Sequence, residues 1–215
     1  MTFADRRSAG HTLAKELAAR TYVRPVVFAL PRGGVPIGVE VAKAVSAPLD
    51  LLLVRKIGVP GHEELAAGSI VDGEQPDLIL NDDIVRHARM SREAIAAAAQ
   101  HELAEIERRR ALYMPGVKPS SANGATAILV DDGVATGASM KAALAAIRRR
   151  SPARVVVAAP VAAPEVAAEL ARLADEVVLL ATPDPFGAVS LYYDDFHQIE
   201  DAEVSALLAE ASASP

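Results

Sequence analysis

The sequence lacks cysteine and tryptophan altogether, and its aromatic content is only 4%. Without cysteine, disulfides, thiolate metal sites and cysteine nucleophiles are excluded. The chain also lacks an apolar run of the roughly 18–20 residues that a membrane-spanning helix needs. Residues 1–7 contain no apolar stretch of the kind that begins a secretory signal. These absences predict a cytoplasmic protein that does not enter a membrane.

Positive charge is also scarce, because the formal net charge is −6. A general nucleic-acid binder needs a basic excess to neutralise phosphates, and this class is therefore excluded. Small phosphorylated ligands need only a local positive pocket and are not excluded. What is present is a chain of 215 residues that is 51% hydrophobic and 23% charged. This length and composition predict one globular domain with a full core.

Short apolar runs alternate with helical patterns along the chain. The runs are continuously apolar, which is typical of strands that are buried on both faces of a parallel sheet. The predicted strands are 26–30, 49–54, 128–130, 154–159 and 176–181. The predicted helices are 3–19, 36–45, 91–113, 140–150, one beginning at Pro164, and 201–210. This alternation predicts an α/β fold with a doubly wound, Rossmann-like central parallel sheet and right-handed crossovers.

Three segments do not follow the alternation. Residues 68–71 and 77–80 flank a turn-forming stretch and predict a small antiparallel hairpin. Residues 57–67 are rich in glycine, proline and charge without periodicity, so we expect a mobile loop. From residue 182 onward, proline, phenylalanine and tyrosine alternate with aspartate. We expect a single domain over 1–215, with a core at about 20–181 and a C-terminal hood at about 182–215.

The most specific signal is Ala-Ile-Leu-Val-Asp-Asp-Gly-Val-Ala-Thr-Gly-Ala-Ser at residues 127–139. A buried strand ends on Asp131 and Asp132, and a loop with Gly and Thr then opens into a helix. Such a loop directs backbone N–H groups and the positive end of the helix dipole at one point, which suits a phosphate. The two carboxylates would repel phosphate, so we expect them to hold sugar hydroxyls or a divalent metal.

Two further strand ends carry positive charge. Arg32-Gly33-Gly34 follows the first predicted strand, and Arg55-Lys56 follows the second. Ligands of a doubly wound sheet bind outside the carboxyl ends of the strands. We therefore expect one crevice with two cationic corners and one anionic corner. The alternatives are an ordinary Gly-Gly turn for the first segment and two solvated cations for the second.

Residues 127–139 resemble the phosphoribosyl-pyrophosphate signature of type I phosphoribosyltransferases, and the architecture resembles that family over roughly 25–200. The resemblance implies that Asp131 and Asp132 engage the ribose hydroxyls and that the loop wraps the 5′-phosphate. The implied phosphate-binding residues are Gly133, Val134, Ala135, Thr136, Gly137, Ala138 and Ser139. Magnesium is the implied cofactor, and its candidate ligands are Asp131, Asp132 and Asp195.

The pyrophosphate side follows from the same resemblance. The family has a pyrophosphate-binding loop after its first core strand, which corresponds here to Arg32, Gly33 and Gly34. Arg55 and Lys56 open a segment that resembles the start of the flexible loop in adenine phosphoribosyltransferases. The implied catalytic residues are Arg32, Lys56, Asp131 and Asp132, and no general base is assigned.

The aromatic tail, 183–196, is similar to the C-terminal hood of 6-oxopurine phosphoribosyltransferases. This likeness implies that Phe186 stacks on a base, with Tyr193 behind it, while Asp194 or Asp195 serves the metal. The alternative is an aromatic cluster that packs the tail onto the core. Those enzymes also carry a lysine after the fourth core strand, and residues 157–165 contain none. The acceptor is therefore left open.

The implied reaction transfers phosphoribose from phosphoribosyl pyrophosphate to a nitrogen acceptor, expected to be a nucleobase such as a purine, in nucleotide salvage. We expect a homodimer. One alternative is a binding protein that senses phosphoribosyl pyrophosphate or a nucleotide without turnover. Another is a phosphatase or phosphorylase that acts on ribose phosphates.

Overall fold

The computed structural model describes residues 2–73 and 76–213. Its main part is a five-stranded sheet of order β2-β1-β6-β7-β8 in which every pair of neighbours is parallel. The strands are β1 (Pro25–Ala29), β2 (Leu49–Leu51), β6 (Thr126–Val130), β7 (Arg154–Val161) and β8 (Glu176–Ala181). The predicted fold class is confirmed.

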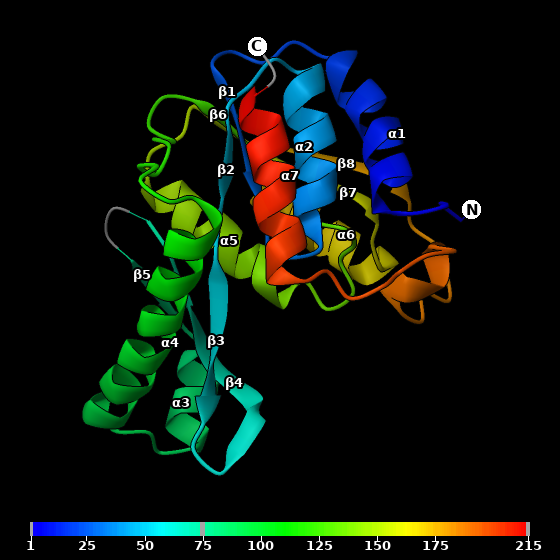
Figure 1. Ribbon diagram of the computed structural model, residues 1–215. Coiled ribbons are helices and arrows are strands. Elements are labelled where there is room, and N and C mark those ends of the chain that lie inside the picture. Colours follow the sequence, from blue (N-terminus) through cyan, green and yellow to red (C-terminus); the bar gives the residue numbers. More distant parts are fainter. Residues whose placement is uncertain (1, 74–75, 214–215) are drawn as a thin grey trace.

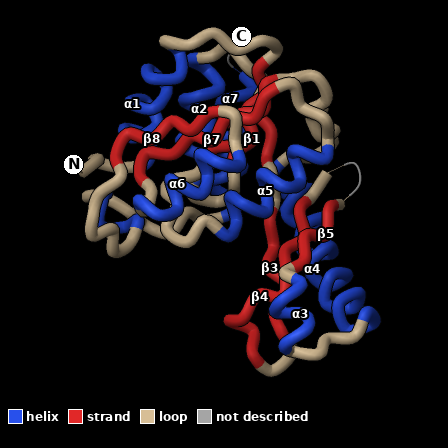
Figure 2. Tube along the Cα trace, turned by 180° about the vertical axis from the view of Figure 1, so that it is seen from behind, coloured by secondary structure: helices blue, strands red, loops and turns tan. Residues whose placement is uncertain are grey.

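Helices cover both faces of this sheet (Figure 1). α1 (Arg6–Ala18) and α2 (Gly34–Ala44) pack on one face, where Val27 and Ile128 point. α5 (Ala138–Arg149) and α6 (Pro164–Leu173) cover the other face, which Figure 2 shows from behind. Successive strand residues point to opposite faces, so two covered faces require continuously apolar strands. α7 (Asp201–Ala213) lies against α2.

A lobe extends away from the main sheet between β2 and β6 (Figure 1). It contains the antiparallel sheet β3-β4-β5 and the helices α3 and α4. Their bounds are β3 (Val54–Val59), β4 (His62–Val71), β5 (Asp77–Leu80), α3 (Asp82–His87) and α4 (Arg92–Tyr113). The predicted hairpin is confirmed by the pairs from Gly68↔Leu80 to Val71↔Asp77. In its predicted link 72–75, Glu74 and Gln75 lie outside the described residues.

The prediction of a mobile loop at 57–67 is wrong. β3 and β4 pair antiparallel across this segment and turn at Gly61, whose φ is +78°. Ile57 and Val59 are buried while Lys56 is exposed, an alternation that the glycines and charges obscured. Arg55 and Lys56 therefore lie within β3, and they do not end the second core strand, which stops at Leu51.

α4 forms where it was expected, with Ser91 as its N-cap; the Ser91 Oγ accepts a hydrogen bond from the Ala94 N–H at 3.2 Å. Arg110 of this helix is only 15% exposed. Its guanidinium lies 2.7 Å from Asp50 Oδ1 and 2.6 Å from Asp72 Oδ2. Asp50 and Asp72 are 1% and 3% exposed. We call Asp50, Asp72 and Arg110 the clamp, because they join α4 and the end of β4 to β2.

Within the described residues, no helix has the length and apolar character needed to cross a membrane.

Candidate functional site

The acidic pair lies at the carboxyl edge of the main sheet. Asp131 and Asp132 follow the last residue of β6, and β6 pairs in register with β1. The segment after β1 crosses a cis peptide between Pro31 and Arg32 and enters α2 at Gly34. A Cβ added at Gly33 would lie 2.1 Å from Asp132 Oδ2. Only glycine fits this close an approach, so the structure brings Arg32-Gly33-Gly34 and Asp131-Asp132 together.

The surroundings of the pair are buried and polar. Arg6 Nε donates to Asp132 Oδ2 at 2.7 Å, and the Tyr193 hydroxyl donates to the Asp132 carbonyl at 2.5 Å. The Asp132 N–H donates to Asp131 Oδ1 at 2.9 Å. Burial raises the pKa of Asp131 well above its ordinary value, and the neighbouring Asp132 carboxylate raises it further. Burial also raises the pKa of Asp132, although Arg6 opposes this shift.

A cavity of about 370 Å³ opens beside the pair. Its lining residues are Arg6, Arg32, Gly33, Asp132, Phe196, His197, Gln198 and Ile199. The volume lies within the range of small-molecule pockets, roughly 300–1,000 Å³. The lining brings two guanidinium groups and one carboxylate to one cavity, so it suits a ligand that carries both anionic groups and hydroxyls.

The loop from Gly133 to Ser139 continues from the pair into α5. The Val134 N–H donates to the Val161 carbonyl at 2.9 Å, which ties the loop to the end of β7. Gly137 has a φ of +71° and precedes α5 without a side-chain cap. The first N–H groups of a helix have no partner inside the helix. The Ala138 N–H makes a long bond to Thr136 Oγ1, at 3.5 Å, and the positive dipole end of the helix, with the N–H groups that follow Ala138, suits an anion.

The aromatic residues of the tail pack mainly on one another. Phe186 is 9% exposed, and its ring lies against Tyr192 at a centroid distance of 5.3 Å. Tyr193 packs between Phe3 and Phe196, at 5.7 and 5.1 Å. Neither Phe186 nor Tyr193 lines the cavity, whereas Phe196 does. The base-binding roles assigned to Phe186 and Tyr193 stay predictions, and the packing role that was the alternative is the one these contacts describe.

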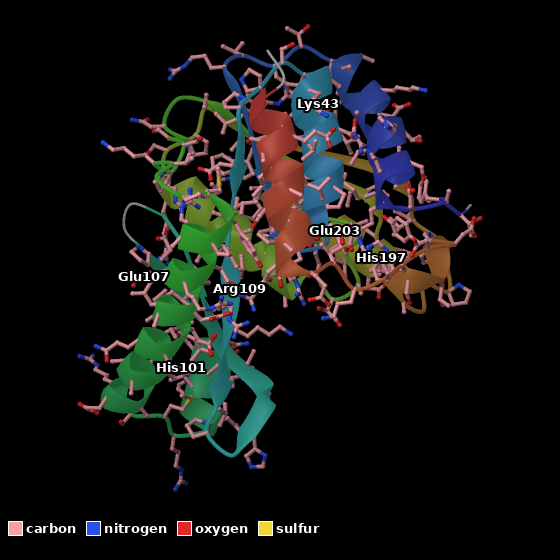
Figure 3. The ribbon with its side chains drawn as sticks, in the orientation of Figure 1. Lys43, His101, Glu107, Arg109, His197 and Glu203 are labelled. Atoms are coloured by element: carbon pink, nitrogen blue, oxygen red, sulfur yellow. The ribbon has the colours of Figure 1, made fainter. Side chains whose placement is uncertain are left out.

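Asp195 is not placed with the acidic pair. Its Oδ1 lies 3.1 Å from His197 Nδ1, and the His197 backbone N–H is the largest cause that lowers the Asp195 pKa. His197 also lies 3.1 Å from Glu203 Oε2, and the two side chains are labelled in Figure 3. Across the described parts of the chain, no three His, Asp or Glu residues form a group that could hold a metal. The assignment of Asp131, Asp132 and Asp195 as metal ligands stays a prediction.

The two cationic corners differ. Arg32 lines the cavity and lies 3.6 Å from Asp201 Oδ1 at the start of α7. Arg55 pairs with Glu102 of α4 at 2.6 Å, inside the lobe. Lys56 is exposed on β3 and is not among the residues that line the cavity. A pyrophosphate role for Arg55 and Lys56 thus rests on the motif alone.

Arg6 and Phe196 line the cavity, and neither was among the predicted site residues. The buried residues of α1 are Arg6, Ala9, Gly10, Leu13, Ala14 and Leu17. Their spacing places Arg6 on the apolar face of the helix, at one end. A charged residue on the buried face of an amphipathic helix needs a partner, and that signal was present in the sequence.

The fold and the cavity define an α/β protein whose site is suited to a sugar phosphate. The chain belongs to the phosphoribosyl transferase domain family, whose sequence pattern matches residues 7–195. The crystal structure of TT1426 from Thermus thermophilus is 42% identical, covers 98% of this chain and 99% of its own, and superposes with a TM-score of 0.84.

Two curated proteins of Mycobacterium tuberculosis, from strains CDC 1551 and H37Rv, are also similar. Their names give phosphoribosyl transferase as a provisional assignment, and each is 45% identical over 209 residues. The match covers 97% of this chain and 47% of each relative. The chain therefore spans about half the length of these curated relatives.

Proposed function

We propose that the protein transfers phosphoribose from phosphoribosyl pyrophosphate to a nitrogen acceptor of the nucleobase class and releases pyrophosphate. One observation carries the proposal: Asp132 lines a cavity together with Arg32 and Gly33. Asp131 precedes it in the chain, and the loop after the pair leads into the start of α5, which has no side-chain cap. These three features correspond to the hydroxyl, diphosphate and 5′-phosphate parts of a single ligand.

Different residues of the site bind different parts of phosphoribosyl pyrophosphate. The two carboxylates accept hydrogen bonds from the ribose hydroxyls, and the first N–H groups of α5 hold the 5′-phosphate. Arg32 and the backbone at Gly33 bind the diphosphate. In the reaction the bond from C1 to the pyrophosphate oxygen breaks, and its electron pair leaves with pyrophosphate. A bond from C1 to the acceptor nitrogen forms, and that nitrogen loses its proton.

Positioning and charge stabilisation are the main contributions that these residues make to the rate. The positive charge that develops on the sugar ring is favoured by the nearby carboxylates Asp131 and Asp132. Arg32 stabilises the negative charge that develops on the leaving pyrophosphate. The part of the site that would exclude water is the hood segment Phe196 to Ile199, which borders the cavity.

Magnesium fits this site as a metal that arrives with the ligand. Mg²⁺ is usually held by one or two carboxylates together with substrate phosphates and waters, so the pair Asp131 and Asp132 supplies enough protein ligands. When bound, the metal neutralises charge on the pyrophosphate group.

The test is a panel of purines, pyrimidines and small amines, incubated with phosphoribosyl pyrophosphate and Mg²⁺ and scored for pyrophosphate release. We expect release with at least one nucleobase and none with the double variant Asp131→Asn, Asp132→Asn. If phosphoribosyl pyrophosphate binds in calorimetry but no acceptor causes release of pyrophosphate, the alternative of a binding protein without turnover is favoured. If the double variant binds phosphoribosyl pyrophosphate as wild type does, Asp131 and Asp132 are not part of the binding site.

A further inference from the structure

Arg6 joins three separate parts of the molecule through one side chain. It belongs to the first turn of α1 and is 8% exposed. Its Nε donates to Asp132 Oδ2 at 2.7 Å, and its Nη1 donates to the His197 carbonyl at 2.9 Å. Its guanidinium carbon lies 3.7 Å from the centroid of the Phe196 ring. The helix, the acidic pair and the hood therefore meet at this guanidinium.

Asp132 is held on two sides as a result. The backbone of Gly33 lies so close that an added Cβ would be 2.1 Å from Asp132 Oδ2. Arg6 binds that same oxygen from α1. No hydrogen bond to Asp132 Oδ1 from elsewhere in the described residues is present, so this oxygen keeps its capacity to accept one from a ligand.

A guanidinium suits this position better than an ammonium. Arginine presents several N–H donors in a rigid plane and stacks on aromatic rings, while lysine is a compact point charge with three donors on a flexible chain and has no flat face. Arg6 uses one donor for Asp132, another for His197 and its flat face for Phe196. A lysine could keep the charge but could not make all three contacts at once.

We propose that Arg6 is a positioning residue of the sugar site, which fixes the Asp132 carboxylate so that its free oxygen meets a ribose hydroxyl. This inference rests on the proposed function, because it takes Asp132 as a ribose ligand. It makes α1 part of the donor-binding machinery, although neither the acidic motif nor the pyrophosphate loop includes any residue of this helix.

Arg7 provides a matched control. It is the next residue of the same helix and carries the same charge, but its side chain is 48% exposed. It pairs with Glu40 and Glu210, and neither of these partners lines the cavity. Replacing Arg7 therefore changes the net charge and the helix in the same way and leaves Asp132 untouched.

The experiment measures binding of ribose 5-phosphate, and of phosphoribosyl pyrophosphate with Mg²⁺, by calorimetry. The variants are Arg6→Gln, Arg6→Lys, Arg7→Gln, Asp132→Asn and the double variant Arg6→Gln, Asp132→Asn. We expect Arg6→Gln to weaken ribose 5-phosphate binding about tenfold or more and Arg7→Gln to change it less than about twofold. Arg6→Lys should recover only part of the loss.

The double variant separates positioning from a general loss of structure. If Arg6 acts through Asp132, the double variant binds no more weakly than Asp132→Asn alone, because the losses are not additive. Additive losses, or an Arg6→Gln variant that binds like wild type while Asp132→Asn does not, would overturn the inference alone. A wild-type protein that binds neither ligand overturns the proposed function and this inference together. Should Arg6→Gln fail to fold, the same comparison is made with Arg6→Lys.

Discussion

Two pairs of aspartates, one buried and one half-buried, each contact one arginine in different parts of the molecule. The clamp combines Asp50 and Asp72 with Arg110, and the site combines Asp131 and Asp132 with Arg6. Burial raises the pKa of Asp72 to about 6, and it raises the pKa values of Asp131 and Asp132 as well. A raised pKa therefore does not tell the functional pair from the structural one.

The carboxylate oxygens do make the distinction. In the clamp all four are bonded inside the protein: Asp50 accepts from Leu51, Ser120 and Arg110, and Asp72 accepts from Leu53 and Arg110. In the site, Asp131 Oδ1 and Asp132 Oδ2 are bonded, and among the described residues no hydrogen bond from another residue reaches Asp131 Oδ2 or Asp132 Oδ1. Unused acceptors beside a cavity indicate a ligand site, whereas saturated acceptors without a cavity indicate a structural contact.

The largest effect is expected from breaking the clamp. Arg110→Met leaves two carboxylates buried without their cation and should lower the free energy of unfolding by about 3–5 kcal/mol. Urea unfolding measures this change. The triple variant Asp50→Asn, Asp72→Asn, Arg110→Met removes the buried charges and should regain most of the loss. Arg6→Gln should lower stability less, because the cavity gives Asp132 access to water. Equal losses at both arginines would contradict the comparison.

A smaller effect is expected from pH. The pKa of Asp72 is about 6 in the folded protein against an ordinary 3.8, so the folded chain binds this proton more tightly than the unfolded chain. The contribution of Asp72 to stability therefore falls as pH rises from about 4 to about 6, by on the order of 3 kcal/mol. Urea unfolding at several pH values in this window gives the free energy of unfolding of wild type and of Asp72→Asn. The difference between the two should show that fall.

Asp175 is the control for the pH measurement. Its pKa is lowered, mainly by its hydrogen bond with Arg148, so its contribution is lost as pH falls and not as pH rises. The difference in the free energy of unfolding between wild type and Asp175→Asn should therefore become smaller as pH falls, and this change should occur at lower pH. A flat difference for Asp72→Asn between about pH 4 and 6 would show that the clamp is already solvated.

The smallest effect is expected at the contact between Gly33 and the acidic pair. Gly33→Ala places a Cβ where Asp132 Oδ2 now lies, so the carboxylate must move away from Arg6. We expect phosphoribosyl pyrophosphate to bind about tenfold more weakly, a loss of about 1.4 kcal/mol. Gly38→Ala, whose Cβ would lie 2.8 Å from the Ala29 Cβ, creates a clash in the same helix away from the cavity. It should lower the melting temperature and leave the affinity unchanged.

The features that could be predicted from the sequence are those formed by residues that follow one another in the chain. The core strands are continuous apolar runs because helices cover both sheet faces, and the acidic pair, its loop and α5 follow one another directly. The end of the second core strand was misplaced because residues 49–54 are apolar without interruption except Asp50, although the chain leaves the main sheet after Leu51.

The contacts that complete the site could not be read in the same way. Arg6 and Asp132 are 126 positions apart, and Arg110 and Asp50 are 60 apart. Periodicity reports which face of an element is buried, but it does not report which distant residue a buried charge will meet. The same limit explains why Phe196 was not distinguished from the other aromatic residues of the tail.

The bond from Arg6 to His197 has a consequence for how the protein is made. During synthesis, α1 leaves the ribosome before residues 196–199, which follow about 190 residues later, at roughly 5–20 residues per second. Until then Arg6 has neither its carbonyl partner nor the ring it lies against. A nascent chain that already contains the acidic pair and the α5 start therefore still lacks one wall of the cavity, and the ligand can stabilise only a chain in which residues 196–199 have also been made.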